Sequence, residues 1–290
     1  MVVSSGRWRR LKPYAYVLPM LLFAAVFVYY PFIRTLGDSF HWVDFQGRLT
    51  GFAGLDNYRY LFGRREFAIA MANTLKLTLI NVPVTIALTL LLAWMTARRT
   101  RLSPLTETLL ALPMAVSMPT VALIFKVLLN PTVGWLNAAL GLQIGWFQDR
   151  HTAMSGVLMM TVWMGIGFNY LLFLGAFRGI NRDVIDSAAM DGASRLRTLF
   201  SIQLPLVSPT MLFVLCTNMV QALMTSGPML IVTEGGPSRS TTTLIYLMYT
   251  SGYRSSNYAV AAAISMVTFV LALGFTVVIF MSERKRVHYQ

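Results

Sequence analysis

Six long apolar segments constrain the fold of this chain more than any other feature. They cover approximately residues 14–34, 70–97, 105–129, 152–177, 206–232 and 258–281. A bilayer core about 30 Å thick needs about 20 apolar residues of helix to cross it. Backbone groups cannot stay unpaired in hydrocarbon, so each segment is predicted to be helical. The sequence therefore predicts an all-α polytopic membrane protein with six transmembrane helices.

Composition excludes several other classes of protein. The 290 residues are 56% hydrophobic and only 12% charged, which is too apolar for an ordinary soluble domain. The net charge of +13 has a simpler explanation than nucleic-acid binding, because Lys and Arg collect in cytoplasmic loops during membrane insertion. The single cysteine, Cys216, lies in an apolar run and excludes a disulfide framework or a cysteine-based metal site. No cleavable signal peptide is expected, since the basic N-terminus leads directly into a segment that can span.

The distribution of Lys and Arg predicts the orientation. With a cytoplasmic N-terminus, the inside segments hold fourteen of these residues and the outside segments hold eight. This excess places residues 1–13, the loop at 178–205 and residues 282–290 in the cytoplasm, on either side of a six-span domain at 14–281. Lys76 and Lys126 fall inside predicted spans, where each could face an anionic solute or extend to the membrane surface.

The spans and the outside loops raise two further expectations. Six prolines lie in the spans, where neighbouring helices are expected to make them tolerable: Pro19, Pro83, Pro113, Pro119, Pro209 and Pro228. The outside loops at 35–69, 130–151 and 233–257 are rich in aromatic residues. These aromatics fit an interfacial belt or the docking of an extracytoplasmic partner. Residues 234–237, Glu-Gly-Gly-Pro, predict a turn.

The polar segment between the fourth and fifth spans cannot lie in hydrocarbon. Residues 182–203 predict a helix, a turn at Gly192 and a second short helix. Asp183 or Asp186 is expected to serve the first N-terminus, where carboxylates meet free N–H groups. Helical spacing predicts that Leu196, Leu199 and Phe200 share one apolar face, and Pro205 fits the first turn of the next span. From the residues alone, the segment is a membrane-surface helix, a solvated connector or a contact for another protein.

The residues of this segment favour the last alternative. Residues 186–193, Asp-Ser-Ala-Ala-Met-Asp-Gly-Ala, followed by Ile-x-Leu-Pro at 202–205, resemble the EAA loop of ABC-importer permeases, with aspartate at 186 replacing glutamate. Residues 232–237 and 54–58 and the pair Leu112-Pro113 resemble the maltose/glycerol-3-phosphate branch of that family. The resemblance covers essentially the whole chain.

The resemblance implies a passive subunit of a larger machine. Two permeases, here expected to be a heterodimer, pair in the cell membrane above two ATPases and receive solute from an extracytoplasmic binding protein. ATP-driven closure of the ATPases then drives alternating access. The chain lacks a phosphate-binding Gly-x-x-x-x-Gly-Lys-Ser/Thr loop, so ATP and Mg are expected on the ATPase and no cofactor on this chain. The residues expected to couple to the ATPase are Asp186, Ser187, Ala188, Asp191, Gly192 and Ala193.

Candidate solute contacts come from polar residues in the fourth and fifth spans. Polar side chains at this depth favour a cavity or a packed interface over lipid, and Asn218, Gln221 and Thr225 share one face at helical spacing. Alignment with the maltose permease by its motifs adds further positions. The full set is Thr161, Met164, Gly165, Phe168, Asn169, Asn218, Gln221, Ala222 and Thr225. Each could instead join one helix to another.

The sequence thus predicts a permease for a sugar or sugar derivative, such as an amino sugar or an oligosaccharide. Glycerol-3-phosphate or its diesters are the alternative solutes. A membrane-embedded enzyme is disfavoured, because no catalytic constellation lies within the spans. A secondary carrier is disfavoured by the lack of evident internal repeats and of buried ion-coupling acids, and it leaves the polar loop unexplained.

Overall fold

The computed structural model describes residues 5–283 and divides into two compact units. Unit 1 contains residues up to Gly63 together with Met248–Val267, and unit 2 contains Arg64–Leu247 and the residues from Thr268 onward. Each unit is described by itself.

Unit 1 begins with a long helix and adds a small hairpin. Helix α1 (Ser5–Ala24) continues through a π-helical turn (Ala25–Tyr29) into α2 (Tyr30–Ser39). Strands β1 (His41–Val43) and β2 (Leu49–Phe52) pair antiparallel, and α3 (Asp56–Phe62) follows. The hairpin is the exception to the predicted all-α architecture. Asn57 fixes it to α2, because its buried amide donates to the carbonyls of Ser39 and His41, both at 3.0 Å.

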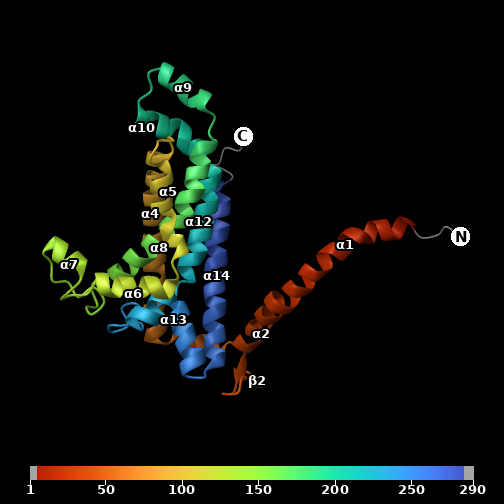
Figure 1. Cartoon of the computed structure of the whole chain (residues 1–290). Helices are drawn as coiled ribbons and strands as arrows, with labels where there is room; N and C mark the ends of the chain where they lie inside the picture. Colours follow the sequence, from red (N-terminus) through yellow and green to blue (C-terminus); the bar gives the residue numbers. More distant parts are fainter. Residues whose placement is uncertain (1–4, 284–290) are drawn as a thin grey trace. The chain divides into compact units, whose positions relative to one another are not determined.

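Three long helices form the centre of unit 2. Helices α4 (Arg65–Thr96), α8 (Ala153–Gly179) and α12 (Ser208–Leu223) pack against one another (Figure 1). Helix α4 runs uninterrupted through Pro83, as the sequence predicted. Helix α7 (Trp135–Leu140) also belongs to unit 2, and α13 (Leu244–Tyr249) and α14 (Tyr258–Glu283) have residues in both units. Two π-helical turns cover Met229–Thr233 and Thr250–Arg254.

Four described helices are long and apolar enough to cross a membrane. They are Tyr16–Ser39, Arg65–Thr96, Ala153–Gly179 and Tyr258–Met281. Two bent pairs raise the number to six if each pair is one span: Ser103–Ala115 with Met118–Leu128, and Arg195–Leu206 with Ser208–Leu223. The polytopic membrane fold is therefore confirmed, and six spans remain the prediction.

The third and fifth predicted spans are each divided into shorter helices by a bend. Helix α5 (Ser103–Ala111) passes into a 3-10 turn (Leu112–Ala115) and then bends by 104° into α6 (Met118–Leu128). Val116 and Ser117 are extended at this bend, and Pro119 lies in the first turn of α6, where its missing N–H has no helical partner to lose. In the fifth span α12 ends at Leu223 instead of residue 232, shortly before a Gly-Pro pair at 227–228.

Candidate functional site

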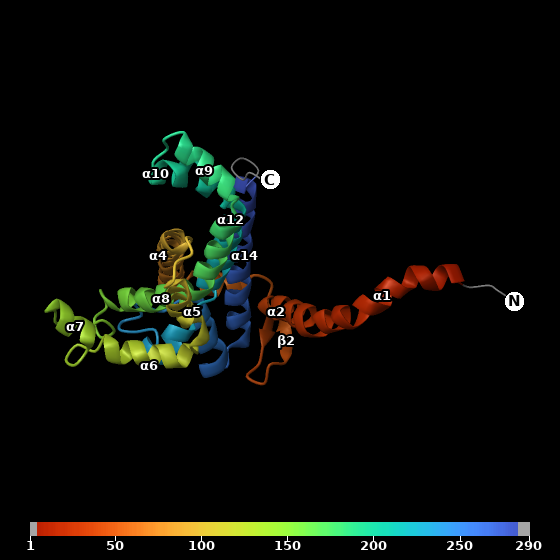
Figure 2. The same cartoon turned by 45° about the horizontal axis from the view of Figure 1, so that its top comes forward.

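The 178–205 loop extends beyond the ends of α4 and α12 in both views of the fold (Figures 1 and 2). Its first helix is α9 (Arg182–Met190), and the Asn181 side chain caps it by accepting a hydrogen bond from the Asp183 N–H at 3.0 Å. The cap itself is therefore Asn181, which was not among the residues predicted for it, and Asp186 lies beyond the first turn. Asp183 lies in the first turn, where its charge favours the helix dipole.

A left-handed turn at Gly192 separates α9 from the second helix. Gly192 has φ +76°, a conformation that a side chain disfavours, and its N–H donates to the Ala189 carbonyl at 3.1 Å. Helix α10 (Arg195–Thr198) follows, capped by Ser194, and continues through a π-helical turn (Leu199–Gln203) into α11 (Leu204–Leu206). The predicted order of helix, glycine turn and short helix is confirmed.

The loop presents most of its predicted coupling residues outward. Asp186, Ser187, Asp191 and Gly192 are exposed and Ala193 is half-buried. Ala188 differs, because only 6% of it is exposed and its carbonyl accepts from the Ala193 N–H at 3.0 Å. The small side chain of Ala188 is therefore buried, whereas Asp186 and Asp191 face outward.

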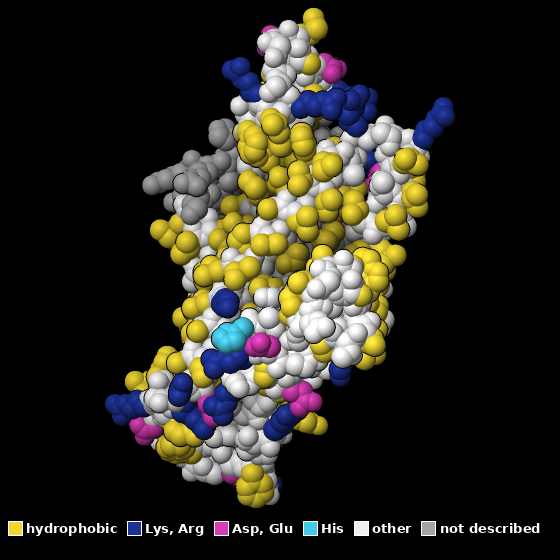
Figure 3. Space-filling view, turned by 90° about the vertical axis from the view of Figure 1, so that its left-hand side faces the viewer, with side chains coloured by type: hydrophobic (Ala, Val, Ile, Leu, Met, Phe, Trp, Pro, Cys, Tyr) yellow, Lys and Arg dark blue, Asp and Glu magenta, His cyan; other side chains and the backbone are white. Residues whose placement is uncertain are grey.

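The second half of the loop exposes apolar side chains next to basic ones. Leu199 is 5% exposed, whereas Leu196 and Phe200 are 59% and 66% exposed. The predicted common face is therefore wrong for Leu199, which packs into the buried cluster of α8 while the other two side chains stay exposed. In Figure 3, basic side chains gather at the loop above a broad hydrophobic surface.

The loop is anchored to the helices by apolar packing. Ile180 and Leu199 belong to the same buried cluster as Phe173 and Phe177 of α8, and Ile185 of α9 packs against it. The loop is therefore continuous with the core of unit 2.

The structure brings several of the predicted solute contacts together as helix-to-helix contacts. Asn169 of α8 and Asn218 of α12 exchange two hydrogen bonds of 2.9 Å and are 3% and 7% exposed. Thr161 accepts a hydrogen bond from Asn81 of α4 at 2.6 Å. Both pairs satisfy buried polar groups within the chain, as expected where helices meet in a membrane.

Other predicted contacts also face the interior. Gly165 lies so close to α4 that an added Cβ would be 2.7 Å from Thr85 Cγ2. Ala222 is 5% exposed, and Met164 packs against the cluster around Phe125. These positions hold helices together in this conformation.

The remaining predicted contacts are not gathered with them. Phe168 is 46% exposed and Gln221 is exposed. Thr225 lies beyond the end of α12, so the predicted common helical face with Asn218 and Gln221 does not extend to it. Lys76 and Lys126 are also exposed, and neither joins the paired asparagines.

Sequence reasoning missed a polar stripe along α4. Its members are buried and recur every three or four residues: Thr74, Thr78, Asn81, Thr85 and Thr89. That spacing was readable in the sequence as one helical face. The stripe places small polar side chains at close helix contacts, and the hydroxyls of Thr78 and Thr85 have no hydrogen-bond partner there.

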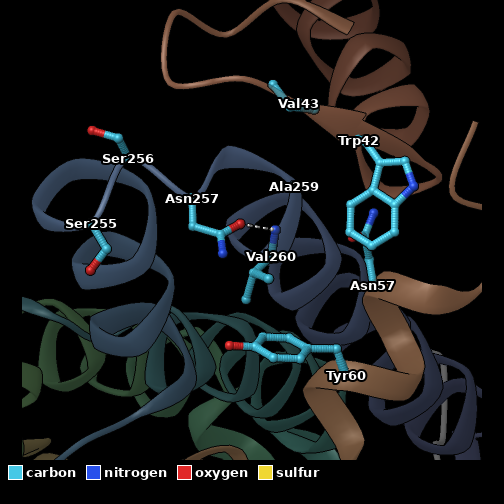
Figure 4. Close-up of a pocket in the computed structure, with 9 residues that line it drawn as sticks. All are labelled: Trp42, Val43, Asn57, Tyr60, Ser255, Ser256, Asn257, Ala259 and Val260. Carbon is cyan, nitrogen blue, oxygen red and sulfur yellow. Dashed lines mark hydrogen bonds between the residues drawn. The ribbon is translucent and has the colours of Figure 1, made fainter. Parts of the chain in front are cut away.

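A separate cavity of about 380 Å³ lies within unit 1. Figure 4 shows the rings of Trp42 and Tyr60 on one side and Ser255 and Ser256 on the other. Asn257 also lines it, with its amide oxygen accepting from the Val260 N–H at 3.1 Å. The rest of the lining is aliphatic apart from Asn57, and none of the lining residues is charged.

Long apolar helices packed together, with a structured helical loop beyond one end, are the architecture of a polytopic membrane protein. The sequence profile of the binding-protein-dependent transport system inner membrane components matches residues 85–286. The chain belongs to this family and is the permease subunit of an ABC importer, with a transport role and no catalytic one.

Relatives cover almost the whole chain. The sn-glycerol-3-phosphate transport system permease protein UgpA of Pectobacterium atrosepticum is 34% identical, over 96% of both chains. The corresponding protein of Yersinia enterocolitica is 35% identical, with 96% of both chains covered. That of Escherichia coli is 34% identical, over 99% of this chain and 98% of its own.

Solved structures share the fold. A chain of the bacterial alginate ABC transporter, in complex with an alginate pentasaccharide-bound periplasmic protein, superposes with a TM-score of 0.84 at 23% identity. The alignment covers 96% of this chain and 97% of that one. A chain of the MetNI methionine ABC transporter gives 0.52 at 13% identity, over 74% of this chain and 92% of that one.

Proposed function

We propose that the 178–205 loop is the contact through which an ATPase subunit drives this permease. The observation that carries the proposal is that Asp186 and Asp191 are both exposed. Asp186 lies in the second half of α9, and Asp191 directly follows that helix, before the Gly192 turn. Two exposed carboxylates on a short, capped helix fit a cleft with basic groups, where charge-assisted hydrogen bonds are strong. ATP and Mg bind on that partner, and closure of two such ATPases moves the spans between inward-open and outward-open states.

The test is co-purification from detergent with a second permease and an ATPase. The double substitution Asp186→Asn with Asp191→Asn keeps the shape of the loop and removes both charges, so the ATPase should be lost while the second permease remains. Asp183→Asn is the matched control, because that acid lies in the first turn of the same helix, far from the Gly192 turn. Retention of the ATPase by the double variant at the wild-type level would contradict the proposal.

The proposed assembly is a heterodimer of permeases with two ATPases, in the cell membrane, with both termini and the 178–205 loop in the cytoplasm. The orientation is supported by the excess of Lys and Arg in those segments. It puts the cavity of unit 1 outside, and we assign this cavity to the surface that the solute-binding protein contacts. Trp42→Ala should then weaken stimulation of ATP hydrolysis by the loaded binding protein and leave basal hydrolysis unchanged. Equal stimulation of variant and wild type would remove the cavity from that surface.

The solute proposed is a neutral sugar or sugar derivative, such as an amino sugar or an oligosaccharide. Residues 153–177 of α8 and all of α12 carry no charged side chain. The phosphate group of an anionic solute is usually bound by Arg or Lys. The second candidate is glycerol-3-phosphate or one of its diesters, and the names of the relatives favour it.

One measurement separates the two candidates. The reconstituted complex is offered maltose, N-acetylglucosamine, sn-glycerol-3-phosphate and glycerophosphocholine with its binding protein, and ATP hydrolysis is recorded. Stimulation by a sugar alone supports the first candidate. Stimulation by the phosphates alone overturns it.

A further inference from the structure

The guanidinium of Arg178, at the start of the 178–205 loop, contacts α5 and the end of α4. Arg178, in the last turn of α8, donates from Nη2 to Glu107 Oε1 of α5 at 2.6 Å. Its Nε donates to the carbonyl of Ala97, directly after α4, at 3.2 Å. Nη2 also lies 3.5 Å from the Thr96 carbonyl. The partners are 71 to 82 residues away in the sequence, so only the tertiary fold brings them together.

The pair differs from the ion pairs on the surface. The side chains of Arg178 and Glu107 are 22% and 27% exposed, so solvent screens them less than a pair such as Arg59 and Asp56, at 79% and 53%. The planar guanidinium can serve a carboxylate and a carbonyl at once from fixed directions. It also places positive charge on the final carbonyls of α4, where the helix dipole favours it.

Arg178 lies where a movement of α9 would reach α8. Ile180, two residues later, ends α8, and Asn181 caps α9 directly after it. Any force on α9 therefore reaches the turn that carries Arg178. Apolar packing of Ile180 and Leu199 connects the loop to α8, but apolar contacts can slide because they have no direction. The hydrogen bonds of Arg178 are directional and fix α8 to α4 and α5.

We infer that Arg178 is a positioning residue that makes α4 and α5 follow the 178–205 loop when it moves, with Glu107 as its partner. This inference rests on the proposed role of the loop. A purely structural ion pair stabilises the complex and leaves its coupling intact. A transmitting pair sets how much solute crosses for each ATP hydrolysed.

The experiment measures solute imported per ATP in proteoliposomes containing the whole complex and its binding protein. The probe is whichever of maltose, N-acetylglucosamine, sn-glycerol-3-phosphate or glycerophosphocholine stimulates wild-type hydrolysis. Glu107→Gln keeps the size of the side chain and removes its charge. Arg178→Lys keeps the charge and removes the two-directional fork. Both should assemble and hydrolyse ATP, and import per ATP should fall at least about fivefold, as for a coupling free energy of ordinary size.

Two controls separate the possible causes. Arg98→Gln removes one exposed positive charge from the same linker after α4 and should leave the ratio unchanged. Arg178→Gln combined with Glu107→Gln should be no worse than Arg178→Gln alone, since residues that act as a unit are not additive.

The outcomes that overturn the inference are distinct from those that overturn the proposed function. A wild-type ratio in Glu107→Gln and Arg178→Lys overturns the inference, and so does a parallel loss of import and hydrolysis. Failure of these two variants to assemble also overturns it, because the pair then serves folding. Loss of the ATPase is tested separately with Asp186 and Asp191, so a failure there refutes the role of the loop.

Discussion

Gly165→Ala tests the close contact of α8 with α4 through a single methyl group. The added Cβ would lie 2.7 Å from Thr85 Cγ2, whereas carbon atoms in contact are about 3.5–4.0 Å apart. Thr85 is fully buried, so its methyl has no open space to enter. The helices must separate by several tenths of an ångström or the threonine must leave its rotamer. Overpacking of this kind costs about 1–3 kcal/mol.

The assay is thermal unfolding of the purified complex in detergent. At about 2–4 °C for each kcal/mol, the midpoint should fall by roughly 2–12 °C. Thr85→Ser removes the clashing methyl and keeps the hydroxyl, so the double variant should recover the part of the loss that comes from the clash. It retains a deficit of about 0.8 kcal/mol for the deleted methyl group.

The matched control lies on the same helix. Gly175 has no neighbour within 4 Å of an added Cβ, so Gly175→Ala should be neutral or stabilise α8 by about 0.5–1 kcal/mol. Equal unfolding midpoints for Gly165→Ala and Gly175→Ala would refute the reasoning. So would a solute-import defect of Gly165→Ala that Thr85→Ser does not relieve, since that result would return Gly165 to the solute path.

Three further predictions concern single local interactions. Asn218→Ala leaves the buried amide of Asn169 without its partner and should lower the free energy of unfolding by about 1–3 kcal/mol, measured by chemical denaturation. If Asn169→Ala with Asn218→Ala costs the sum of the two single variants, the pair does not interact. Gly192→Ala should cost about 1–2 kcal/mol in the left-handed turn and weaken binding of the ATPase, and Gly192→Asn should weaken it less. If wild type and Gly192→Ala bind the ATPase with equal affinity, the turn is not needed for docking. Asn181→Ala removes the cap of α9 and should cost about 0.5–2 kcal/mol, visible as faster amide exchange confined to that helix; unchanged exchange would contradict the capping assignment.

The membrane class, the family and the layout of the 178–205 loop were predictable from the sequence. Each depends on local patterns: apolar runs long enough to span, the spacing of residues 186–193 before Ile-x-Leu-Pro, and a glycine where the chain must turn. Local rules failed where two local preferences compete. One example is the bend at Val116 and Ser117, and another is the end of α12 at Leu223. In both places a long apolar run favours a continuous helix and nearby prolines favour a break. Composition alone does not decide which tendency prevails.

Other features were decided by the tertiary structure alone. Asn169 and Asn218 read in sequence as candidate solute contacts, yet they satisfy each other, because a buried amide bonds to whichever polar group the packing brings near. Ala188 belongs to the recognisable motif, but packing turns it inward and leaves the acids outside. In the sequence, Arg178 only adds to the positive charge of the 178–205 loop. The fold brings Glu107 and the end of α4 into hydrogen-bonding distance of it. The sequence determines which buried polar groups need hydrogen-bond partners. Only the packing of helices distant in sequence determines which partners they find.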